Sequence, residues 1–353
     1  MNRFDRQYIL NGFGIDGQKK LRNASVLMVG AGGLGCPALL YLAAAGVGRI
    51  GVIDGDILNV TNLNRQVLFG EKDLGKNKAE QAVRHFQGKY SDITWEIFPE
   101  FLTVQNAQEL IADYDLVIDG TDNFPTRYLI NDACLLHGKP FVFGAIYQHE
   151  GQVSVFNLGG NACNYRDVHS EMPGPNEIPN CAETGVLGVL PGIIGNLMAL
   201  EAIKVLSGYG VPLKNRMLYF NSLSSQTYEV ELTPKDTSSA PDSWTMLENT
   251  DYQLACGTAK EMTWKEAMGK MNQNVAFVDV RELDELPPLV CTGLMKIPMS
   301  VLETQLDKLE DSEQILIFCQ SGMRSQKAAQ ILSETYPDKA IFSIKGGINA
   351  LKS

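Results

Sequence analysis

A glycine-rich turn between two apolar segments most constrains what this chain can fold into. Residues 26–29 predict a buried strand, which is followed by Gly30-Ala31-Gly32-Gly33-Leu34-Gly35 and a helical segment to Ala45. A second predicted strand, residues 50–53, ends on Asp54. Strand, glycine turn, helix, strand and acid in this order are typical of a nucleotide-binding βαβ unit.

The residues of this turn have separate physical roles. Gly30 permits the tight turn, Gly32 lets the backbone approach a phosphate, and Gly35 lets helix and strand pack closely. The helix offers unpaired N–H groups and the positive end of its dipole to an anion. Asp54 lies where a carboxylate accepts hydrogen bonds from ribose hydroxyls. The alternative is a glycine turn that serves packing alone.

The polar residues after Asp54 favour a triphosphate over a dinucleotide. Arg65 and Lys78 supply cations, and Asp56, Asn62 and Gln66 supply further polar groups beside the expected pocket. The glycine turn already serves a dinucleotide's pyrophosphate, whereas β- and γ-phosphates need neutralising before the α-phosphorus is attacked. Taken alone, Arg65 and Lys78 also fit ordinary surface charge. NAD is the usual ligand of this fingerprint, so a nicotinamide-dependent oxidoreductase stays open as an alternative.

Strand and helix signals alternate further along the chain and predict an α/β fold. Residues 93–98 and 115–119 predict strands on either side of a helix at 104–112. We therefore expect a Rossmann-like, doubly wound, mostly parallel sheet whose ligand lies at the carboxyl ends of the strands. Asp122 and Asn123 follow a strand at such an end and are candidates for Mg²⁺ or adenosine contacts, with plain turn formation as the alternative.

The later strands and a shift in composition indicate the domain organisation. Four further strands at 141–145, 152–156, 217–221 and 227–232 predict an antiparallel extension of the sheet. We expect residues 1–232 to form the first domain, residues 233–252 a linker, and residues 253–353 a smaller α/β domain. A long irregular loop at about 159–191, rich in Pro, Asn and Gly, contains Cys181 and is typical of a functional loop.

Composition limits the classes of partner. The formal net charge of −11 argues against direct nucleic-acid binding, which usually needs a basic surface. No apolar run was found that suggests a membrane span, and residues 1–5 lack the apolar core of a signal peptide, so we expect a cytoplasmic protein. The odd count of seven cysteines favours reduced thiols over a disulfide framework.

One cysteine in the second domain is a candidate nucleophile. Cys319 follows a predicted strand, and Arg324 closes the loop where a helix begins. N–H groups and a positive charge around a sulfur lower a cysteine pKa and stabilise the thiolate, and the same cradle suits a persulfide or a phosphate. The alternative is an inert buried cysteine at a strand end.

These motifs together resemble those of two known families. Residues 1–232 resemble the MoeB/ThiF adenylating enzymes, which are relatives of the ubiquitin-activating enzymes. The residues that carry this resemblance are Arg6-Gln7, Gly30 to Gly35, Asp54-Gly55-Asp56, Asn62 to Gln66, Lys78, Asp119 to Asn123 and the Cys181 loop. Residues from about 260 to the end resemble a rhodanese sulfurtransferase domain through Asp279 to Glu282, the Cys319 loop and Gly346-Gly347-Ile348. In this order the two parts resemble the MoeB–rhodanese fusions.

The resemblance implies an activity and a set of partners. The substrate would be the C-terminal glycine carboxylate of a small ubiquitin-like sulfur carrier ending in Gly-Gly, similar to MoaD or ThiS. That carboxylate would attack the α-phosphorus of ATP, and the Cys319 persulfide, loaded by a cysteine desulfurase-type donor, would then displace AMP. Molybdopterin synthesis, thiamine synthesis and tRNA thiolation all use this chemistry.

The resemblance also assigns roles to single residues. Gly33 would approach the phosphates, Asp54 the ribose, and Asn62, Arg65 and Lys78 the triphosphate. Asp122 would hold Mg²⁺ with Asn123 adjacent, and Arg6 would reach the ATP of the partner in a homodimer. Cys181 would form a thioester or an acyl-disulfide.

The sequence departs from the family at two places. The family usually carries two CxxC pairs that bind zinc, whereas here Cys163 and Cys256 are not part of such pairs, so we expect no structural zinc. Residues 283–299 are shorter and less regular than the usual rhodanese run, although the Cys319 loop is intact. A non-catalytic adaptor that binds nucleotide and carrier is the remaining alternative.

Overall fold

The computed structural model describes residues 3–172, 185–235, 239–250, 252, 260–270, 274–282, 285, 289, 293–320, 322–336 and 338–351. The chain divides into two units, Met1–Tyr252 and Gln253–Ser353, and each is described by itself.

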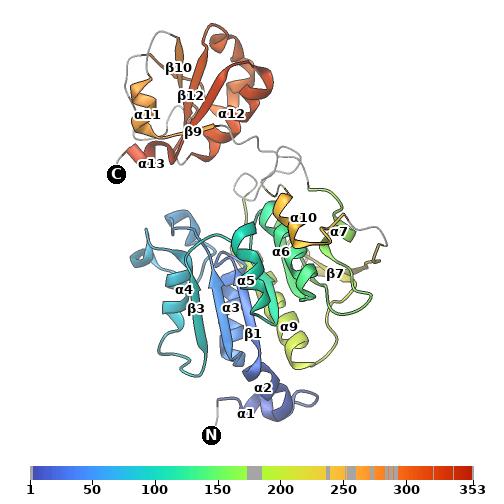
Figure 1. Cartoon of the computed structure of the whole chain (residues 1–353). Coiled ribbons are helices and arrows are strands. Elements are labelled where there is room, and N and C mark those ends of the chain that lie inside the picture. Colours follow the sequence, from blue (N-terminus) through green and yellow to red (C-terminus); the bar gives the residue numbers. More distant parts are fainter. Residues whose placement is uncertain are drawn as a thin grey trace. The chain divides into compact units, whose positions relative to one another are not determined.

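The described part of the first unit contains an eight-stranded sheet in the order β3-β2-β1-β4-β5-β6-β7-β8 (Figure 1). Its strands are β1 Ser25–Val29, β2 Arg49–Ile53, β3 Thr94–Phe98, β4 Leu116–Asp119, β5 Phe141–Tyr147, β6 Glu150–Phe156, β7 Arg216–Asn221 and β8 Gln226–Glu231. The strands from β3 to β5 pair in parallel, and those from β5 to β8 pair antiparallel. The expected parallel sheet with an antiparallel extension is confirmed.

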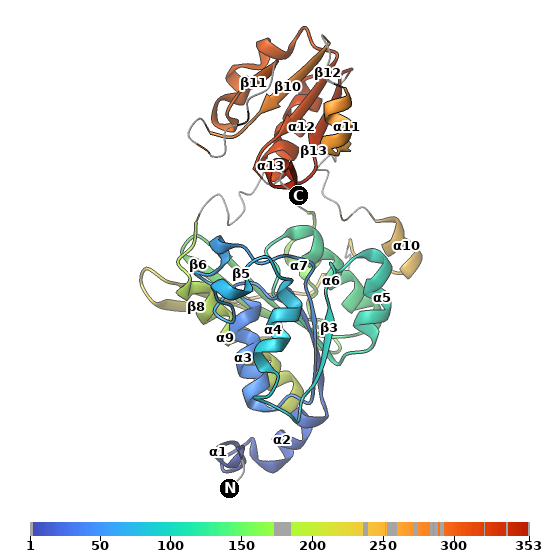
Figure 2. The same ribbon diagram turned by 90° about the vertical axis from the view of Figure 1, so that its left-hand side faces the viewer.

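Helices cover both faces of this sheet (Figures 1 and 2). They are α1 Asp5–Tyr8, α2 Gly14–Asn23, α3 Gly35–Ala45, α4 Lys78–Phe86, α5 Val104–Ala112, α6 Phe124–His137, α7 Tyr165–Val168, α9 Val189–Ser207 and α10 Trp244–Asn249. In β1, Val26 and Met28 belong to the core under α3 and α9, whereas Leu27 and Val29 belong to the core under α5 and α6. Burial on both faces explains the continuous apolar run of this strand.

Part of the stretch whose composition suggested a linker is ordered on the first unit. Ser243 caps α10, since its hydroxyl accepts a hydrogen bond from the Met246 N–H at 3.4 Å. Leu247 is fully buried in the core under α5 and α6, and the Tyr252 hydroxyl donates to Asp132 at 2.6 Å. A flexible linker over the whole of 233–252 is therefore not what the structure shows.

One described helix is long and apolar enough to cross a membrane, which corrects the expectation that no such run exists. This helix, α9, instead packs against α3, β5 and β6 inside the first unit (Figure 2). Its Glu201 is buried and accepts hydrogen bonds from the Leu213 N–H at 2.7 Å and the Lys204 amine at 2.6 Å. We therefore interpret α9 as a core helix of the unit.

The second unit has a parallel sheet of five described strands in the order β11-β10-β12-β13-β9. These are β9 Lys260–Met262, β10 Val275–Asp279, β11 Leu294–Lys296, β12 Gln314–Phe318 and β13 Ala340–Ile344. The helices are α11 Trp264–Gly269, α12 Met323–Thr335 and α13 Gly347–Leu351. Alternate residues of β12 face opposite cores, so α12 covers one face and α11 with α13 the other.

Candidate active sites

The glycine turn lies at the carboxyl ends of β1, β2 and β4, as predicted. Gly30 has φ of 91°, and a Cβ on it would lie 2.9 Å from the Gly120 carbonyl oxygen after β4. A Cβ on Gly35 would lie 2.1 Å from the Gly30 carbonyl oxygen. Both positions therefore require glycine, the first for its conformation and both for their close contacts.

Asp54 is anchored beside this turn. One carboxylate oxygen accepts the Ala31 N–H and the other the Asp56 N–H, each at 2.8 Å. Burial raises the pKa of Asp54, although the charge of Lys78 and the two N–H groups oppose that shift. Lys78 is buried and forms an ion pair with the Asp56 carboxylate at 2.7 Å.

Arg65 and Gln66 lie against the glycine turn from a different segment of the chain. A Cβ on Gly33 would lie 3.3 Å from the Cβ of Pro191 and 3.4 Å from the Cγ of Arg65. The Arg65 guanidinium donates to the Thr61 carbonyl at 2.8 Å and to the side chain of Asn64 at 3.1 Å. Among the described residues it has no carboxylate partner, so its charge is available to an anion.

Gln66 is buried, yet its Oε1 has no hydrogen-bond partner among the described residues. Its Nε2 lies 3.8 Å from a Cβ built on Gly32. A buried amide left unsatisfied beside a phosphate-type turn is expected where a ligand supplies the missing partner. This observation and the free charge of Arg65 show that the residues present fit ATP.

The other predicted ligands of the site take different positions. The Asn62 side chain accepts the Asn59 N–H at 3.0 Å, and the Asn123 side chain caps α6 by accepting the Thr126 N–H at 2.9 Å. Asp122 is exposed and forms no ion pair within the described part of the chain. No group of three or more potential metal ligands occurs among the described residues.

One of the predicted residues, Arg6, is not brought to this site by its own chain. Arg6 is exposed on α1, and its neighbour Gln7 donates to the Ala45 carbonyl at the C-terminal end of α3 at 3.2 Å. Because the glycine turn meets the opposite end of α3, Arg6 lies roughly 16 Å or more from its own chain's turn. Cys181 falls outside the described residues.

Sequence reasoning missed two features that hold the site in place. Arg127 on α6 is buried and donates to the Asp119 carboxylate at 3.0 Å and to the Thr121 carbonyl at 3.2 Å, which fixes the loop after β4. A Cβ on Gly188, just before α9, would lie 2.1 Å from the Asn64 carbonyl oxygen. The segment that precedes α9 is thus packed directly on the segment that contains Arg65. An arginine in the first turn of a helix that follows a strand-end aspartate was the only signal for the first feature.

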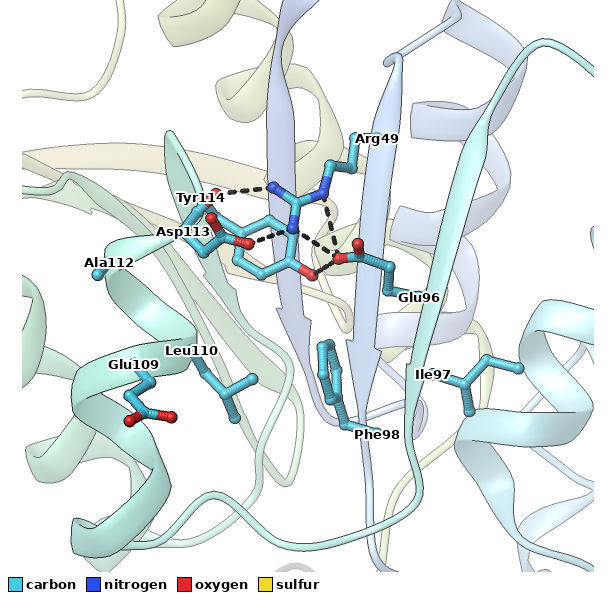
Figure 3. Close-up of a pocket in the computed structure, with 9 residues that line it drawn as sticks. All are labelled: Arg49, Glu96, Ile97, Phe98, Glu109, Leu110, Ala112, Asp113 and Tyr114. Carbon is cyan, nitrogen blue, oxygen red and sulfur yellow. Dashed lines mark hydrogen bonds and ion pairs between the residues drawn. The ribbon is translucent and has the colours of Figure 1, made fainter.

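The first unit also has a hollow of about 630 Å³ between β3 and α5, shown in Figure 3. The Arg49 guanidinium lies there between the carboxylates of Glu96 and Asp113, and the Tyr114 hydroxyl also donates to Glu96. Arg49 is at the amino end of β2, away from the carboxyl ends, and its charge is already neutralised. This hollow therefore offers no uncompensated arginine to a phosphate, unlike the glycine turn.

In the second unit Cys319 follows β12 and is fully buried. The Gly322 N–H donates to its Sγ at 3.1 Å, and Gly322 has φ of 98° at the start of α12. The Arg324 guanidinium forms a two-fold ion pair with Glu285. Among the described residues one N–H group, that of Gly322, donates to the sulfur, and the arginine of the predicted cradle is paired with a carboxylate.

The C-terminal helix α13 holds the cysteine loop from the other side. The Ile348 N–H donates to the Cys319 carbonyl at 2.9 Å, and the Asn349 N–H donates to the Gln320 carbonyl at 3.1 Å. Trp264 on α11 donates from Nε1 to the Gly347 carbonyl at 2.6 Å. A Cβ on Gly347 would lie 2.3 Å from the Cys319 carbonyl oxygen, so glycine is required there.

Residues 4–241 match the ThiF family. The chain belongs to the ThiF family. Residues 263–353 match the rhodanese-like domain family, so the C-terminal part of this ThiF-family chain is a rhodanese-like domain. The predicted resemblance to MoeB–rhodanese fusions is confirmed.

Related proteins share this arrangement. A probable adenylyltransferase/sulfurtransferase MoeZ of Mycobacterium tuberculosis is 38% identical, with 99% of this chain and 92% of that protein covered. A sulfur carrier protein adenylyltransferase of Thermus thermophilus is 48% identical over 73% of this chain and 97% of its own length. The adenylyltransferase and sulfurtransferase MOCS3 of Arabidopsis thaliana is 36% identical over 99% and 82%.

A solved structure of E. coli MccB with ATP shares the fold. It has a TM-score of 0.59 and 23% identity, and it covers 68% of this chain and 74% of that one. At this identity the likeness concerns the fold alone.

Proposed function

We propose that this chain uses ATP to adenylate the C-terminal glycine carboxylate of a small ubiquitin-like sulfur carrier and then transfers sulfur from Cys319 to that carbonyl. The chain is thus an adenylyltransferase joined to a sulfurtransferase. The observation that carries the proposal is the convergence of Gly33, Arg65 and Pro191, since it adds an unpaired cation and the start of α9 to the phosphate turn. A nicotinamide-dependent oxidoreductase would have no use for this cation or for the Cys319 loop.

In the adenylation step a carrier carboxylate oxygen forms a bond to the α-phosphorus of ATP, and pyrophosphate leaves with the electrons of the broken P–O bond. The turn N–H groups and the unpaired Arg65 stabilise negative charge as it moves toward the leaving group. Lys78 is neutralised by Asp56 before ATP binds, so this pair must open or share Lys78 with a phosphate. Asp54, held by two backbone N–H groups, is positioned for the ribose.

Mg²⁺ is the ion expected with ATP, and we assign it to Asp122. This carboxylate is exposed after β4 and lacks an ion-pair partner in the described part of the chain. Mg²⁺ usually keeps several waters and takes only one or two carboxylates together with phosphate oxygens. A single protein carboxylate therefore suffices.

We propose a homodimer in which Arg6 serves the partner's ATP. Arg6 is exposed and makes no ion pair with any described residue, and it lies beyond the far end of α3 from its own glycine turn. Around it Ile9, Leu10 and Ile15 are exposed by 75%, 45% and 57%. Such apolar side chains are expected at an interface between subunits.

In the sulfur step the terminal sulfur of the Cys319 persulfide attacks the acyl carbon of the adenylate, and AMP leaves. The product is an acyl disulfide between Cys319 and the carrier. A thiolate, for which Cys181 is the proposed source, attacks the Cys319 sulfur, so the S–S bond breaks and the carrier thiocarboxylate leaves with the electron pair. The disulfide formed between the two cysteines is then reduced by an external thiol. A cysteine desulfurase-type persulfide donor would load Cys319. We further propose a cytoplasmic enzyme without structural zinc, acting in molybdopterin synthesis, thiamine synthesis or tRNA thiolation.

ATP–pyrophosphate exchange with candidate carriers ending in Gly-Gly tests the adenylation proposal. We expect exchange that depends on one carrier and on Mg²⁺, because the carboxylate is needed to form the adenylate. Exchange without any carrier would contradict the proposed substrate. Tight binding of ATP and carrier with no exchange would favour the non-catalytic adaptor.

A further inference from the structure

An ion pair occupies the arginine of the cysteine loop. Arg324 lies in the first turn of α12, and its two terminal nitrogens both donate to the carboxylate of Glu285, one of them at 2.7 Å. The same carboxylate accepts the backbone N–H of Glu282 at 2.8 Å. Glu285 is therefore held at three points, and two of them take up the planar donor face of Arg324.

The positive charge of Arg324 is balanced by the negative charge of Glu285. The hydrogen bonds from Arg324 lower the pKa of Glu285 to about 2, so this carboxylate is ionised at neutral pH. Glu285 in turn raises the pKa of Arg324, and the charge of Cys319 contributes to that shift. Arg324 follows two residues after Gly322, whose N–H donates to the Cys319 sulfur, and the bidentate face of its guanidinium is turned to Glu285.

The second arginine near the loop is also paired. Arg281 is fully buried, and its guanidinium binds the Asp279 carboxylate at 2.8 Å and the Gln320 side-chain oxygen at 3.4 Å. Each of these two arginines is therefore paired with a carboxylate, and Glu282 adds a further negative charge near Arg324. Among the described residues of this region, an oxyanion that approaches the sulfur meets no unpaired guanidinium, and it must displace Glu285 to obtain the donor face of Arg324.

The Cys319 sulfur needs fewer N–H groups and positive charges around it than an oxyanionic donor does. It accepts the Gly322 N–H at 3.1 Å and lies at the start of α12, where the helix dipole favours one negative charge. A thiolate or a persulfide carries one such charge. Thiosulfate carries two negative charges. Its sulfonate oxygens need a bidentate donor such as Arg324, whose donor face is already bound to Glu285.

We propose that Glu285 determines which sulfur donor the Cys319 loop accepts, because it competes with small oxyanionic donors for Arg324 and leaves persulfide donors unaffected. This inference rests on the proposed function of Cys319 as a sulfur acceptor. In the favoured reaction the Cys319 thiolate attacks the outer sulfur of R–S–SH. The new Cys319 S–S bond forms, the donor S–S bond breaks, and R–S⁻ leaves with the electron pair. In the disfavoured reaction thiosulfate transfers its outer sulfur and sulfite leaves.

The variant Glu285→Gln tests this directly in the full-length protein, since it keeps the shape of the side chain and removes its charge. Persulfide on Cys319 is measured by cyanide release as thiocyanate, with thiosulfate or glutathione persulfide as the donor. We expect the KM for thiosulfate to fall about two- to fivefold, the range measured for ion pairs at a protein surface. The rate with glutathione persulfide should stay within about twofold.

Glu261→Gln is the matched control, because Glu261 forms an exposed ion pair with Lys345 at 3.9 Å in the same unit. It should change neither donor's kinetics. An unchanged KM for thiosulfate in Glu285→Gln would overturn the inference, and so would an equal loss of rate with both donors, which would make Glu285 a structural anchor. If neither donor loads Cys319 in the wild-type protein, the proposed function of Cys319 itself fails and the inference with it.

Discussion

The two reactive regions of this chain treat their cations differently. At the nucleotide site the Arg65 guanidinium donates to a backbone carbonyl and to the side chain of Asn64, and no carboxylate of the described residues cancels its positive charge. At the cysteine loop Arg281 and Arg324 are each bound to a carboxylate. The first region is prepared for a highly charged anion, whereas the second is electrically balanced before a donor arrives.

This difference follows from the chemistry that each region performs. A triphosphate brings several negative charges at once, and its cleavage moves charge onto the leaving pyrophosphate, so an unpaired arginine contributes most in the transition state. A thiolate or persulfide carries a single charge, which one N–H group and a helix terminus can stabilise. We therefore propose that an arginine is a phosphate ligand in the first region and a structural or selective group in the second.

The largest effect is expected from Arg65→Ala. Removal of an unpaired charge beside the phosphates should lower the carrier-dependent ATP–pyrophosphate exchange by about 10²- to 10³-fold, as for other transition-state donors. Loading of sulfur on Cys319 should be unchanged, because Arg65 belongs to the other region. Arg84→Ala removes an exposed arginine of α4 and serves as the control. Equal exchange in both variants would show that the two regions do not differ as described.

A smaller effect is expected when Arg65 is displaced but kept. In Gly188→Ala the new methyl group would lie 2.1 Å from the Asn64 carbonyl oxygen, so the backbone that carries Arg65 must move. We expect exchange to fall about 10- to 100-fold, the cost of a displacement near one ångström at a reacting site.

Gly192→Ala is the matched control for that variant, because a Cβ there has no heavy atom within 4 Å. It lies in the first turn of the same helix, where alanine is favoured over glycine. Exchange in Gly192→Ala should equal that of the wild type. A loss of similar size in both alanine variants would assign the effect to α9 as a whole and not to the contact with Asn64.

The smallest effect is expected from a change at a paired arginine that we assign to neither reactive region. Arg166 and Asp132 form a buried ion pair at 2.7 Å, and the Tyr252 hydroxyl donates to the same carboxylate. Tyr252→Phe removes one hydrogen bond to a charged group and should lower the free energy of unfolding of the first unit by about 1 to 2 kcal/mol. Urea denaturation measures this change, and Tyr228→Phe, on a half-exposed tyrosine, should show none. Unchanged stability in Tyr252→Phe would show that this hydroxyl adds nothing to the pair.

Much of the fold could be predicted from the sequence because local signals and tertiary contacts agree there. The run of β1, the glycines that follow it and Asp54 all depend on neighbours close in sequence, and each takes its expected place. The helix α10 could not be predicted in this way. Only three of its six residues are apolar, and the helix depends on the burial of Leu247 in the core under α5 and α6 and on the Ser243 cap.

The residues of the candidate sites could be predicted from the sequence, but their ion-pair partners could not. Arg65, Lys78 and Arg324 all read as free cations in the sequence, yet Lys78 and Arg324 have carboxylate partners that lie 22 and 39 positions away. The tertiary fold determines which residues form these ion pairs, and no local sequence pattern predicts them. The same holds for Gly188, whose need for glycine comes from a segment more than a hundred residues earlier.

Conversion of the carrier to its thiocarboxylate in a single turnover tests the central claim most directly. Intact mass of the carrier would be followed with the wild-type chain, ATP, Mg²⁺ and a persulfide donor, and again with Cys319→Ala or without ATP. We predict replacement of one carrier oxygen by sulfur only with the wild-type chain and ATP, and accumulation of acyl-adenylate with Cys319→Ala. Thiocarboxylate formed without ATP, or at the wild-type rate by Cys319→Ala, would contradict the account.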